Sequence, residues 1–483
     1  MFDLFGECEN LLEIDVSKFD TSRCTEMTYM FSGCSQITSL NLSNFKTNKV
    51  TGMNGLFSQC INLTSFDLSS FSTSQVNGMA NMFNRCYKLK FLNLSNFNTE
   101  NVDNMPNMFS DCYELTSLII SNFNVEKVIV MAYMFQYNLK LEYLDLSSFV
   151  PKNAENMFNM FQYCESLKYI KFKNFNTSSN SGFSGFFYHC ESLTSLEVSS
   201  FITDNAIDLS RMFSHCYKLK SLDLSKFNTS KVIYMTEMFD SCESLTSIDL
   251  SSFITKNIWD FSKLFYNCYS LNNLEINHFV TTEVSYMTSM FYNCTSLTSL
   301  NLSNFETKQI RTMLNFFSDC HSLKYLDIVN FDTSFVTTMK NMFSNCYSLI
   351  SLNLSNFNTE NVKDMSYMFS NCKNLKIIDL QSFNTENVLY MTDMFYNCSS
   401  LNILDLDNFN TINVYDFNNM FRSSTNLLFL NITRFNCLRS TRYSNMFEGC
   451  YNLTVTLYPQ YCSKIINSAP SYVKFIKIYD DDE

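Results

Sequence analysis

Apolar residues recur along this chain with a period of 26 residues, and each period contains two different patterns. With residue 8 numbered zero, the zero position returns at 34, 60 and so on to 450, without insertion or deletion. Positions +3, +6 and +8, as in Leu219–Leu224, give L-x-x-L-x-L, which predicts a short strand with alternate side chains inward. Positions +16, +19, +22 and +23, as in Val232–Phe239, predict a short one-sided helix.

Aromatic and methionine positions repeat with the same register. Position +23 is Phe in all eighteen cases from Phe5 to Phe447, and position +11 is Phe in seventeen, from Phe19 to Phe435. All 26 methionines fall at +19 or +22. A fixed period between about 20 and 50 residues indicates a solenoid, in which each coil buries its apolar side against its neighbours.

Turn-forming residues separate the two patterns. Thr stands at +13 in fourteen of seventeen units, just before the second pattern, where it predicts a helix N-cap. Asn, Asp or Gly precedes the zero position in half of the units, as at Gly33 and Asn371, which predicts a left-handed residue where the helix stops. Each unit is therefore predicted to be strand, turn, short helix and turn.

The repeat sets the expected domain boundaries. Residues 1–450 are predicted to form one solenoid of about 17 units. Met1 falls at +19 of an incomplete unit, so we expect the opening to be a truncation or an internal start. Residues 451–483 lose the pattern, and their apolar stretch YVKFIKIY (472–479) is predicted to cap the last coil, before an acidic tail at 480–483.

The repeat resembles a known family. The L-x-x-L-x-L strand and the M-F-x-x-C-x-x-L that joins successive units are similar to the leucine-rich repeats of BspA-like surface proteins. The spelling SNFNTENVKDMSYMFSNC at 355–372 is closest to the branch found in mycoplasmas, other low-GC bacteria and some protists. The resemblance implies an α/β repeat solenoid, a right-handed leucine-rich-repeat coil with one short parallel strand and one short helix per 26-residue unit. It also implies a cell-surface or secreted protein with a role in adhesion or recognition.

Charge and hydropathy limit the partners. The net charge of −12 disfavours nucleic acid and anionic membrane surfaces as partners. No run of about 18 apolar residues is present, so no membrane insertion is predicted.

Cysteine is abundant but regularly placed. Sixteen of the 19 cysteines occupy the zero position, where Asn138 and Ser424 are the exceptions. This placement predicts a column of buried free thiols. No C-x-x-C motif or nearby histidine cluster accompanies them, so neither a metal site nor a cofactor is predicted. The pattern leaves a bond between Cys437 and Cys462 open.

Acidic residues recur at the outward strand position +7. Because +6 and +8 point inward, the +7 side chains are predicted to share one exposed surface. That surface is either a ligand face, for a cationic partner or for Ca²⁺, or a solvated ladder of charges. The G-G-x-G-x-D motif of calcium-binding repeats is absent, which disfavours Ca²⁺. The ten acidic residues at +7 are Asp15, Asp67, Asp145, Glu197, Asp223, Asp249, Glu275, Asp327, Asp379 and Asp405.

One irregular region interrupts this acidic surface. Aromatic and basic residues are predicted to share the strand face between 138 and 190, and exposed aromatics beside charge are typical of binding hot spots. Pairing of Lys171 with Asp145 and Glu197 on adjacent strands explains part of this arrangement equally well. The candidate ligand-binding residues are Tyr143, Tyr169, Lys171, Lys173, Asp223, Asp249 and Glu275.

No catalytic constellation accompanies the repeat. The chain has no nucleophile–base pair and no Gly-rich phosphate loop, so we predict a non-enzyme without catalytic residues. The favoured interpretation is a cell-surface binding or adhesion module that presents positions +5, +7 and +9 to a protein or glycan. The alternative is a cytoplasmic protein-interaction scaffold with the same fold.

Overall fold

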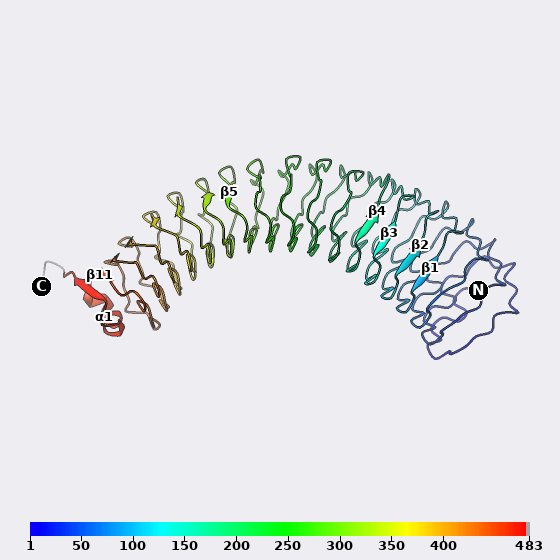
Figure 1. Ribbon diagram of the computed structural model, residues 1–483, viewed down its shortest axis with the longest axis horizontal. Coiled ribbons are helices and arrows are strands. Elements are labelled where there is room, and N and C mark those ends of the chain that lie inside the picture. Colours follow the sequence, from blue (N-terminus) through cyan, green and yellow to red (C-terminus); the bar gives the residue numbers. More distant parts are fainter. Residues whose placement is uncertain (480–483) are drawn as a thin grey trace. The chain divides into compact units, whose positions relative to one another are not determined.

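The computed structural model describes residues 1–479, which divide into two compact units. Unit 1 comprises Met1–Phe253, and unit 2 begins at Ile254. Within each unit the chain winds through successive coils that stack in sequence order (Figure 1). The strands that the structure defines pair in parallel, and from β1 to β10 each pairs with the equivalent residues of a neighbouring coil, so the predicted solenoid is confirmed.

Unit 1 contains four short strands at the predicted L-x-x-L-x-L position. β1 pairs with β2 and β3 pairs with β4, both in parallel. Their bounds are Phe91–Asn93 for β1, Ser117–Ile119 for β2, Tyr143–Asp145 for β3 and Tyr169–Lys171 for β4.

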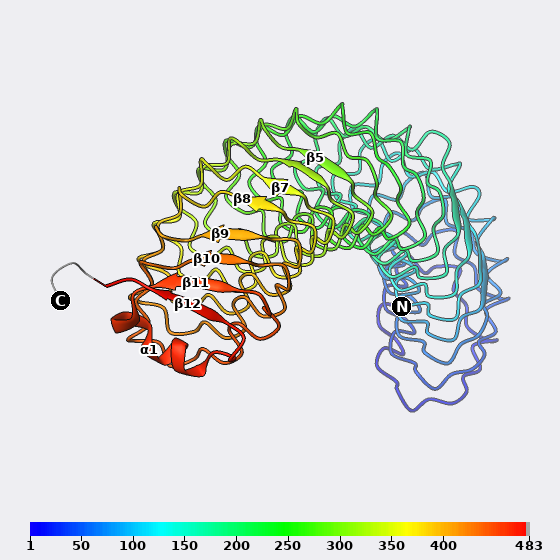
Figure 2. The same ribbon diagram turned by 60° about the vertical axis from the view of Figure 1, so that its left-hand side comes forward.

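Unit 2 contains the remaining strands and a helix, α1. β5 pairs with β6, β7 pairs with β8, and a four-stranded sheet follows in the order β12-β11-β10-β9 (Figure 2). The bounds are Ser299–Asn301 (β5), Tyr325–Asp327 (β6), Ser351–Leu352 (β7), Ile377–Ile378 (β8), Ile403–Asp405 (β9), Phe429–Asn431 (β10), Thr454–Leu457 (β11), Pro459–Ser468 (α1) and Lys474–Lys477 (β12).

The prediction of one helix per unit is wrong. The single α-helix in residues 1–479 is α1, which lies after the last repeat. Positions +16, +19, +22 and +23 are indeed buried, as in Val336, Met339, Met342 and Phe343, which are all fully shielded from solvent. The sequence therefore identified the buried positions of this segment correctly, but not the conformation of its backbone.

Alternating hydrogen bonds replace the helix. Between Met339 and Cys346, every second N–H bonds to a carbonyl 25 residues ahead, in the next coil. Of the intervening N–H groups, those of Met342, Ser344 and Cys346 bond to the carbonyl three residues back. The N–H of Lys340 bonds to Thr338 Oγ1 instead. The inter-coil bonds run from Met339 to Asp364, Asn341 to Ser366, Phe343 to Met368 and Asn345 to Ser370, over 2.7–3.0 Å.

Coil spacing explains this outcome. Neighbouring strands of a sheet lie about 4.8 Å apart, whereas an α-helix with its side chains is about 10–12 Å wide. A run of linked turns is thin enough to stack at the strand spacing and to bond directly to the next coil. Parallel bridges at +18 form a second ladder immediately before these turns, as between Thr338 and Asp364.

The turns require residues with positive φ at two positions per coil. Position +25 was predicted to be left-handed, and this is confirmed, with φ values of 60° at Asn345 and 61° at Asn371. Position +21 is left-handed too, as at Asn341 with φ of 56°, and this was not predicted. Both are the third residue of a four-residue turn, where positive φ favours Gly and Asn.

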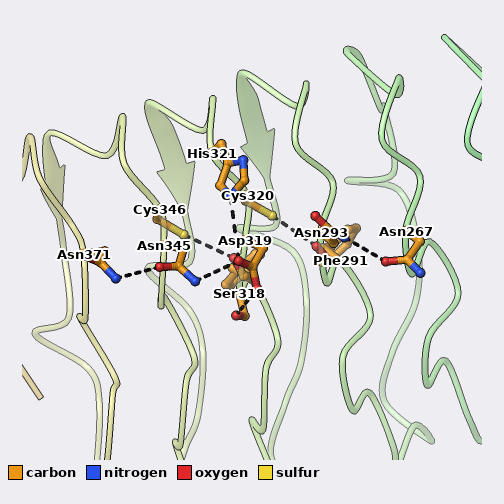
Figure 3. A network of polar contacts seen from close by, with 11 residues as sticks. Asn267, Phe291, Asn293, Ser318, Asp319, Cys320, His321, Asn345, Cys346 and Asn371 are labelled. Carbon is orange, nitrogen blue, oxygen red and sulfur yellow. Dashed lines mark hydrogen bonds and ion pairs between the residues drawn. The ribbon is translucent and has the colours of Figure 1, made fainter. Parts of the chain in front are cut away.

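The +25 side chains add a ladder of amides in unit 2 (Figure 3). Asn345 Nδ2 donates to Asp319 Oδ1 at 2.8 Å, and Asn371 Nδ2 donates to Asn345 Oδ1 at 2.8 Å. The same pattern links Asn293 to Asn267 over 2.9 Å. Asn at +25 therefore has two roles: it tolerates the positive φ of the turn, and its side chain forms hydrogen bonds to the neighbouring coils.

We expect Asn345→Ala to destabilise unit 2 by about 1–2 kcal/mol, because a Cβ is disfavoured at positive φ and the two amide contacts are lost. Asn345→Gly loses the same contacts but tolerates the backbone, so it should be the milder change. Urea unfolding followed by circular dichroism measures both variants. Equal effects of Ala and Gly would contradict a left-handed residue at this position.

The +13 threonines do not cap helices. In each typical coil the hydroxyl accepts the N–H of the residue 25 positions ahead and donates to the carbonyl of that same residue. Thr333 Oγ1 accepts from Asn358 N at 2.9 Å and donates to Asn358 O at 2.8 Å. Thr333 is fully buried, and its two hydrogen bonds to the exposed Asn358 are partly buried. Each threonine thus joins two coils, and we call this pair of hydrogen bonds the threonine staple.

The zero-position cysteines form the predicted column of free thiols, which are buried except for Cys8. Where their bonds are defined, each thiol donates to the Phe carbonyl 29 residues before it, over 3.0–3.4 Å, as from Cys346 to Phe317. Ser424 makes the equivalent bond to Phe395 at 2.8 Å, and Asn138 Nδ2 bonds to Phe109 at 3.0 Å. All three residue types supply a donor to a buried carbonyl, which explains why Asn and Ser substitute here.

Residues 451–479 extend the sheet of unit 2. β11 pairs with β10, β12 pairs with β11, and α1 connects β11 to β12. β12 lies within the predicted YVKFIKIY stretch, so we propose that residues 451–479 form the cap of a solenoid that ends at residue 450. The predicted acidic tail, residues 480–483, lies outside the described part of the chain.

Candidate interaction surface

The strand face, defined as positions +5, +7 and +9, is the exposed side of the short strands. In β1, β2, β4, β5 and β9 the residue at +6 is buried while those at +5 and +7 are exposed. The predicted parity of the strand is therefore confirmed. Nine of the ten acidic residues at +7 are exposed, and Asp145 is half-buried.

The +7 carboxylates also have a structural role. The Oδ1 of Asp or Asn at +7 accepts the backbone N–H of the residue at +9, over 2.9–3.3 Å. Asp supplies this acceptor at 15, 67, 145, 223, 249, 327, 379 and 405, and Asn supplies it at 41, 93, 301, 353 and 431. Asp and Asn turns of this kind end a strand. The sequence signal was the preference for Asp and Asn over Glu at +7, which charge alone does not explain.

At Asp15, Asp145 and Asp223 these hydrogen bonds lower the pKa of the carboxyl group. Bonds from Ser17 lower the pKa of Asp15, and the backbone N–H and hydroxyl of Ser225 lower the pKa of Asp223. Burial opposes ionisation of Asp145, but bonds from Ser147 and Lys171 outweigh it and bring its pKa to about 2. These three carboxyl groups of the strand face therefore stay ionised at neutral pH.

The structure brings together three of the predicted site residues in unit 1. Tyr143 and Tyr169 are paired in register on β3 and β4, and their rings stack at 5.9 Å with a 10° angle between planes. We call them the aromatic pair; they are 49% and 43% exposed. Lys171 Nζ lies 3.0 Å from Asp145 Oδ2, so cross-strand charge pairing accounts for this lysine. Lys173 is exposed and makes no ion pair with any residue of the described chain.

The remaining predicted site residues are more scattered. Asp223 and Asp249 occupy the same position of consecutive coils in unit 1, and both are exposed. Glu275 belongs to unit 2, where it lines a shallow hollow of about 400 Å³ together with Tyr325 and Asp327. Tyr325 is 67% exposed and was not among the predicted residues.

The most exposed apolar group on the strand face was missed from the sequence. Ile377, Ile403 and Phe429 stand at +5 of three successive coils in unit 2, and we call them the apolar row. They are 74%, 65% and 54% exposed. Ile377 and Ile403 line one hollow with Asp405, and Ile403 is paired with Phe429 across β9 and β10.

The apolar row could have been recognised from the residues at +5 of the repeat. Position +5 is Ser in eight of seventeen coils, so a large apolar residue there departs from the spelling of the repeat. Since most coils fold without a large apolar residue at +5, the three successive ones in the apolar row have no evident structural role in the repeat. Exposed apolar clusters of this kind mark interaction sites in soluble proteins.

Metal and membrane features can be stated for the described residues. Within residues 1–479, no group of three or more His, Cys, Asp or Glu side chains is placed to hold a metal ion. In the same part of the chain, no helix combines the length and the apolar character needed to cross a bilayer.

Comparison with solved structures finds several matches. One is a leucine-rich repeat protein from Bacteroides ovatus, 19% identical, with a TM-score of 0.41, covering 89% of this chain and 88% of that chain. A leucine-rich cell surface protein from Faecalibacterium prausnitzii is 18% identical, with a TM-score of 0.37 and coverages of 68% and 83%. The pneumococcal vaccine antigen PcpA is 13% identical, with a TM-score of 0.34 and coverages of 91% and 88%. A search of curated proteins gave no match.

A family model matches the repeats themselves, which confirms the predicted relationship to the BspA-like leucine-rich repeats of the mycoplasma branch. It matches five overlapping stretches, residues 1–114, 86–195, 181–299, 270–377 and 347–461. Together these matches span residues 1–461, and the chain belongs to the family described as "Mycoplasma protein of unknown function, DUF285".

Proposed function

We propose that this chain is a non-catalytic protein-binding module of a cell surface and that the apolar row is its principal contact. The single observation that carries the proposal is the exposure of Ile377, Ile403 and Phe429 on successive coils. Burying an exposed Ile or Phe side chain on binding gains about 1.5–3 kcal/mol. Three such side chains in one row can therefore form the centre of a binding site.

Charge beside the apolar row favours a partner of defined chemistry. Asp379 and Asp405 are exposed at +7 of the coils that carry Ile377 and Ile403. A partner segment that combines apolar side chains with Lys or Arg complements both features. The carboxylates then contribute mainly to the rate of association and to specificity, as charges around an interface do.

The aromatic pair offers a second contact in unit 1. The stacked rings of Tyr143 and Tyr169 are about half exposed, and Lys173 is exposed two positions beyond Lys171. Tyrosine is enriched at binding hot spots because its ring is large, rigid and amphipathic. Adhesion to a protein or glycan is a role that either surface would serve.

A cytoplasmic scaffold is the alternative that uses the same surfaces. The two functions differ in location, so protease digestion of intact source cells separates them. A surface module loses its signal in an immunoblot after external protease, whereas a cytoplasmic scaffold retains it until the cells are lysed.

The binding experiment uses random peptides displayed on phage and selected on the full chain. We expect the selected peptides to combine apolar and basic residues. Changing Ile377, Ile403 and Phe429 to Ser, the commonest residue at +5, should weaken their binding at least about tenfold, which corresponds to about 1.4 kcal/mol.

The matched control is Ser351→Ala, at the same position of β7. It should leave peptide binding and the folding of the chain unchanged. Selected peptides that are acidic, or that bind the triple Ser variant as well as the native chain, would contradict the proposed site.

A further inference from the structure

Two cysteines outside the thiol column lie in contact in unit 2. Cys437 Sγ and Cys462 Sγ are 2.7 Å apart, and both residues are 1% exposed. This distance is only about 0.7 Å longer than a disulfide bond. The thiols of the column, by contrast, donate to backbone carbonyls of the preceding coil over 3.0–3.4 Å.

The position of the pair follows from the threonine staple of the other coils. Cys437 stands at +13, where Thr normally contacts the backbone of the residue 25 positions ahead. The residue 25 positions after Cys437 is Cys462. The chain thus places cysteine at both ends of one inter-coil contact, and the hydroxyl–backbone pair of the other coils becomes a thiol–thiol pair.

The backbone around Cys462 also departs from regular structure. Cys462 lies within α1 but has φ of −128° and ψ of 23°, which interrupts the helix at this residue. Cys437 N donates to Tyr461 O at 3.0 Å, and Cys462 Sγ donates to Phe435 O at 3.4 Å. These bonds hold α1 against the last repeat at the point where the two sulfur atoms meet.

We propose that Cys437 and Cys462 are a disulfide-forming site that covalently fastens residues 451–479 to the last repeat under oxidising conditions. The bond would close a loop equal in length to one repeat. It would tie down the segment that carries β11, α1 and the edge strand β12, whose Ile476 is 52% exposed.

The oxidation is a thiol–disulfide exchange with a low-molecular-weight disulfide. The thiolate of one cysteine attacks the reagent and expels one thiol, which leaves a mixed disulfide on the chain. The second cysteine attacks that sulfur and expels the second thiol. The two protein thiols lose two electrons and two protons, which convert the reagent disulfide into two thiols.

The exchange requires residues 451–479 to open or to be still unfolded. The hydrogen bond with Cys462 and burial both raise the pKa of the Cys437 thiol, so the thiolate is scarce while the pair is covered. The thiolate is the nucleophile in the exchange. Oxidation is therefore expected to be faster during refolding than in the folded chain.

The test exposes the full chain to glutathione disulfide, once in the folded state and once during refolding from urea. Free thiols are then alkylated in denaturant, and cross-linked peptides are mapped by mass spectrometry. We expect one predominant cross-link, between the peptides that contain Cys437 and Cys462, with the column cysteines alkylated. Absence of this cross-link in both arms, or equal cross-linking among column cysteines, overturns the proposal.

Amide hydrogen exchange of residues 451–479 provides a second readout. The bond should slow exchange there by about 30-fold or more, in line with the usual stabilisation by a native disulfide. Cys437→Ser and Cys462→Ser should abolish this response to oxidant. Cys450→Ser, at a column position where Ser424 occurs naturally, should retain it. Loss of the response in Cys450→Ser, or no response in the native chain, counts against the site.

Discussion

Phe343→Ala is expected to lower the free energy of unfolding of unit 2 by about 3–5 kcal/mol. Phe343 is fully buried at +23, and its ring stacks on Phe317 at 5.7 Å and on Phe369 at 5.6 Å, with planes within 9° of parallel. The substitution removes the ring from both stacks and leaves a cavity that neighbouring coils cannot fill, because they are held in register by their own hydrogen bonds. Urea unfolding followed by circular dichroism measures the loss.

The matched control is Phe429→Ala on the strand face. Phe429 is 54% exposed, so its truncation should change the free energy of unfolding by less than about 0.5 kcal/mol. In a repeat protein each coil contacts mainly its neighbours, so hydrogen exchange should increase most in the coils on either side of Phe343. Equal effects of the two substitutions, or an increase spread evenly over unit 2, would contradict a column of stacked rings.

The repeat predicted the fold because it reports which side chains are inward. Residues such as Leu349, Leu352 and Leu354 at +3, +6 and +8 are buried as their spacing requires. The register of the strands also follows from the sequence, since equivalent residues such as Phe429 and Ile403 pair directly. A constant period without insertions leaves no other way to align the coils.

The helix could not be rejected from the spacing alone. Val336, Met339, Met342 and Phe343 have the periodicity of a helix, and they also fit a chain of turns whose alternate N–H groups bond outward. The choice depends on whether the next coil lies close enough to accept those bonds, which is a tertiary property. Asn341 at +21 was a local sign, because Asn tolerates the positive φ that these turns need.

The interaction surface was predicted only in part, because several candidate residues were chosen for their acidic side chains at +7, whereas the apolar row stands at +5. Asp379 and Asp405 accept backbone hydrogen bonds from +9, so acidity at +7 has a structural cause as well as any binding role. The +5 position has no such constraint, and large apolar residues there, as at Ile403, are free to serve binding. Residues that depart from the repeat consensus without a structural role therefore indicate a binding surface better than the acidic residues at +7 do.

Thr333→Val is expected to destabilise unit 2 by about 1–3 kcal/mol although it preserves the shape of the side chain. The valine cannot accept the N–H of Asn358 or donate to its carbonyl, which Thr333 Oγ1 contacts at 2.9 Å and 2.8 Å. Both hydrogen bonds are partly buried, so water replaces the lost partner only in part. Val125 occupies the equivalent position naturally, which indicates that the coil still forms.

The comparison with Thr333→Ser separates hydrogen bonding from packing. Serine keeps the hydroxyl and loses one methyl group, which costs about 0.8 kcal/mol or more depending on the cavity it leaves. If the staple acts through its hydroxyl, Val should be the more destabilising change in urea unfolding, and amide exchange at Asn358 should increase with Val but not with Ser. The opposite order would mean that the methyl group is what holds these coils together. The same reasoning extends to Cys437, where the staple has become a pair of thiols, and it links the stability of the repeats to the redox site at their end.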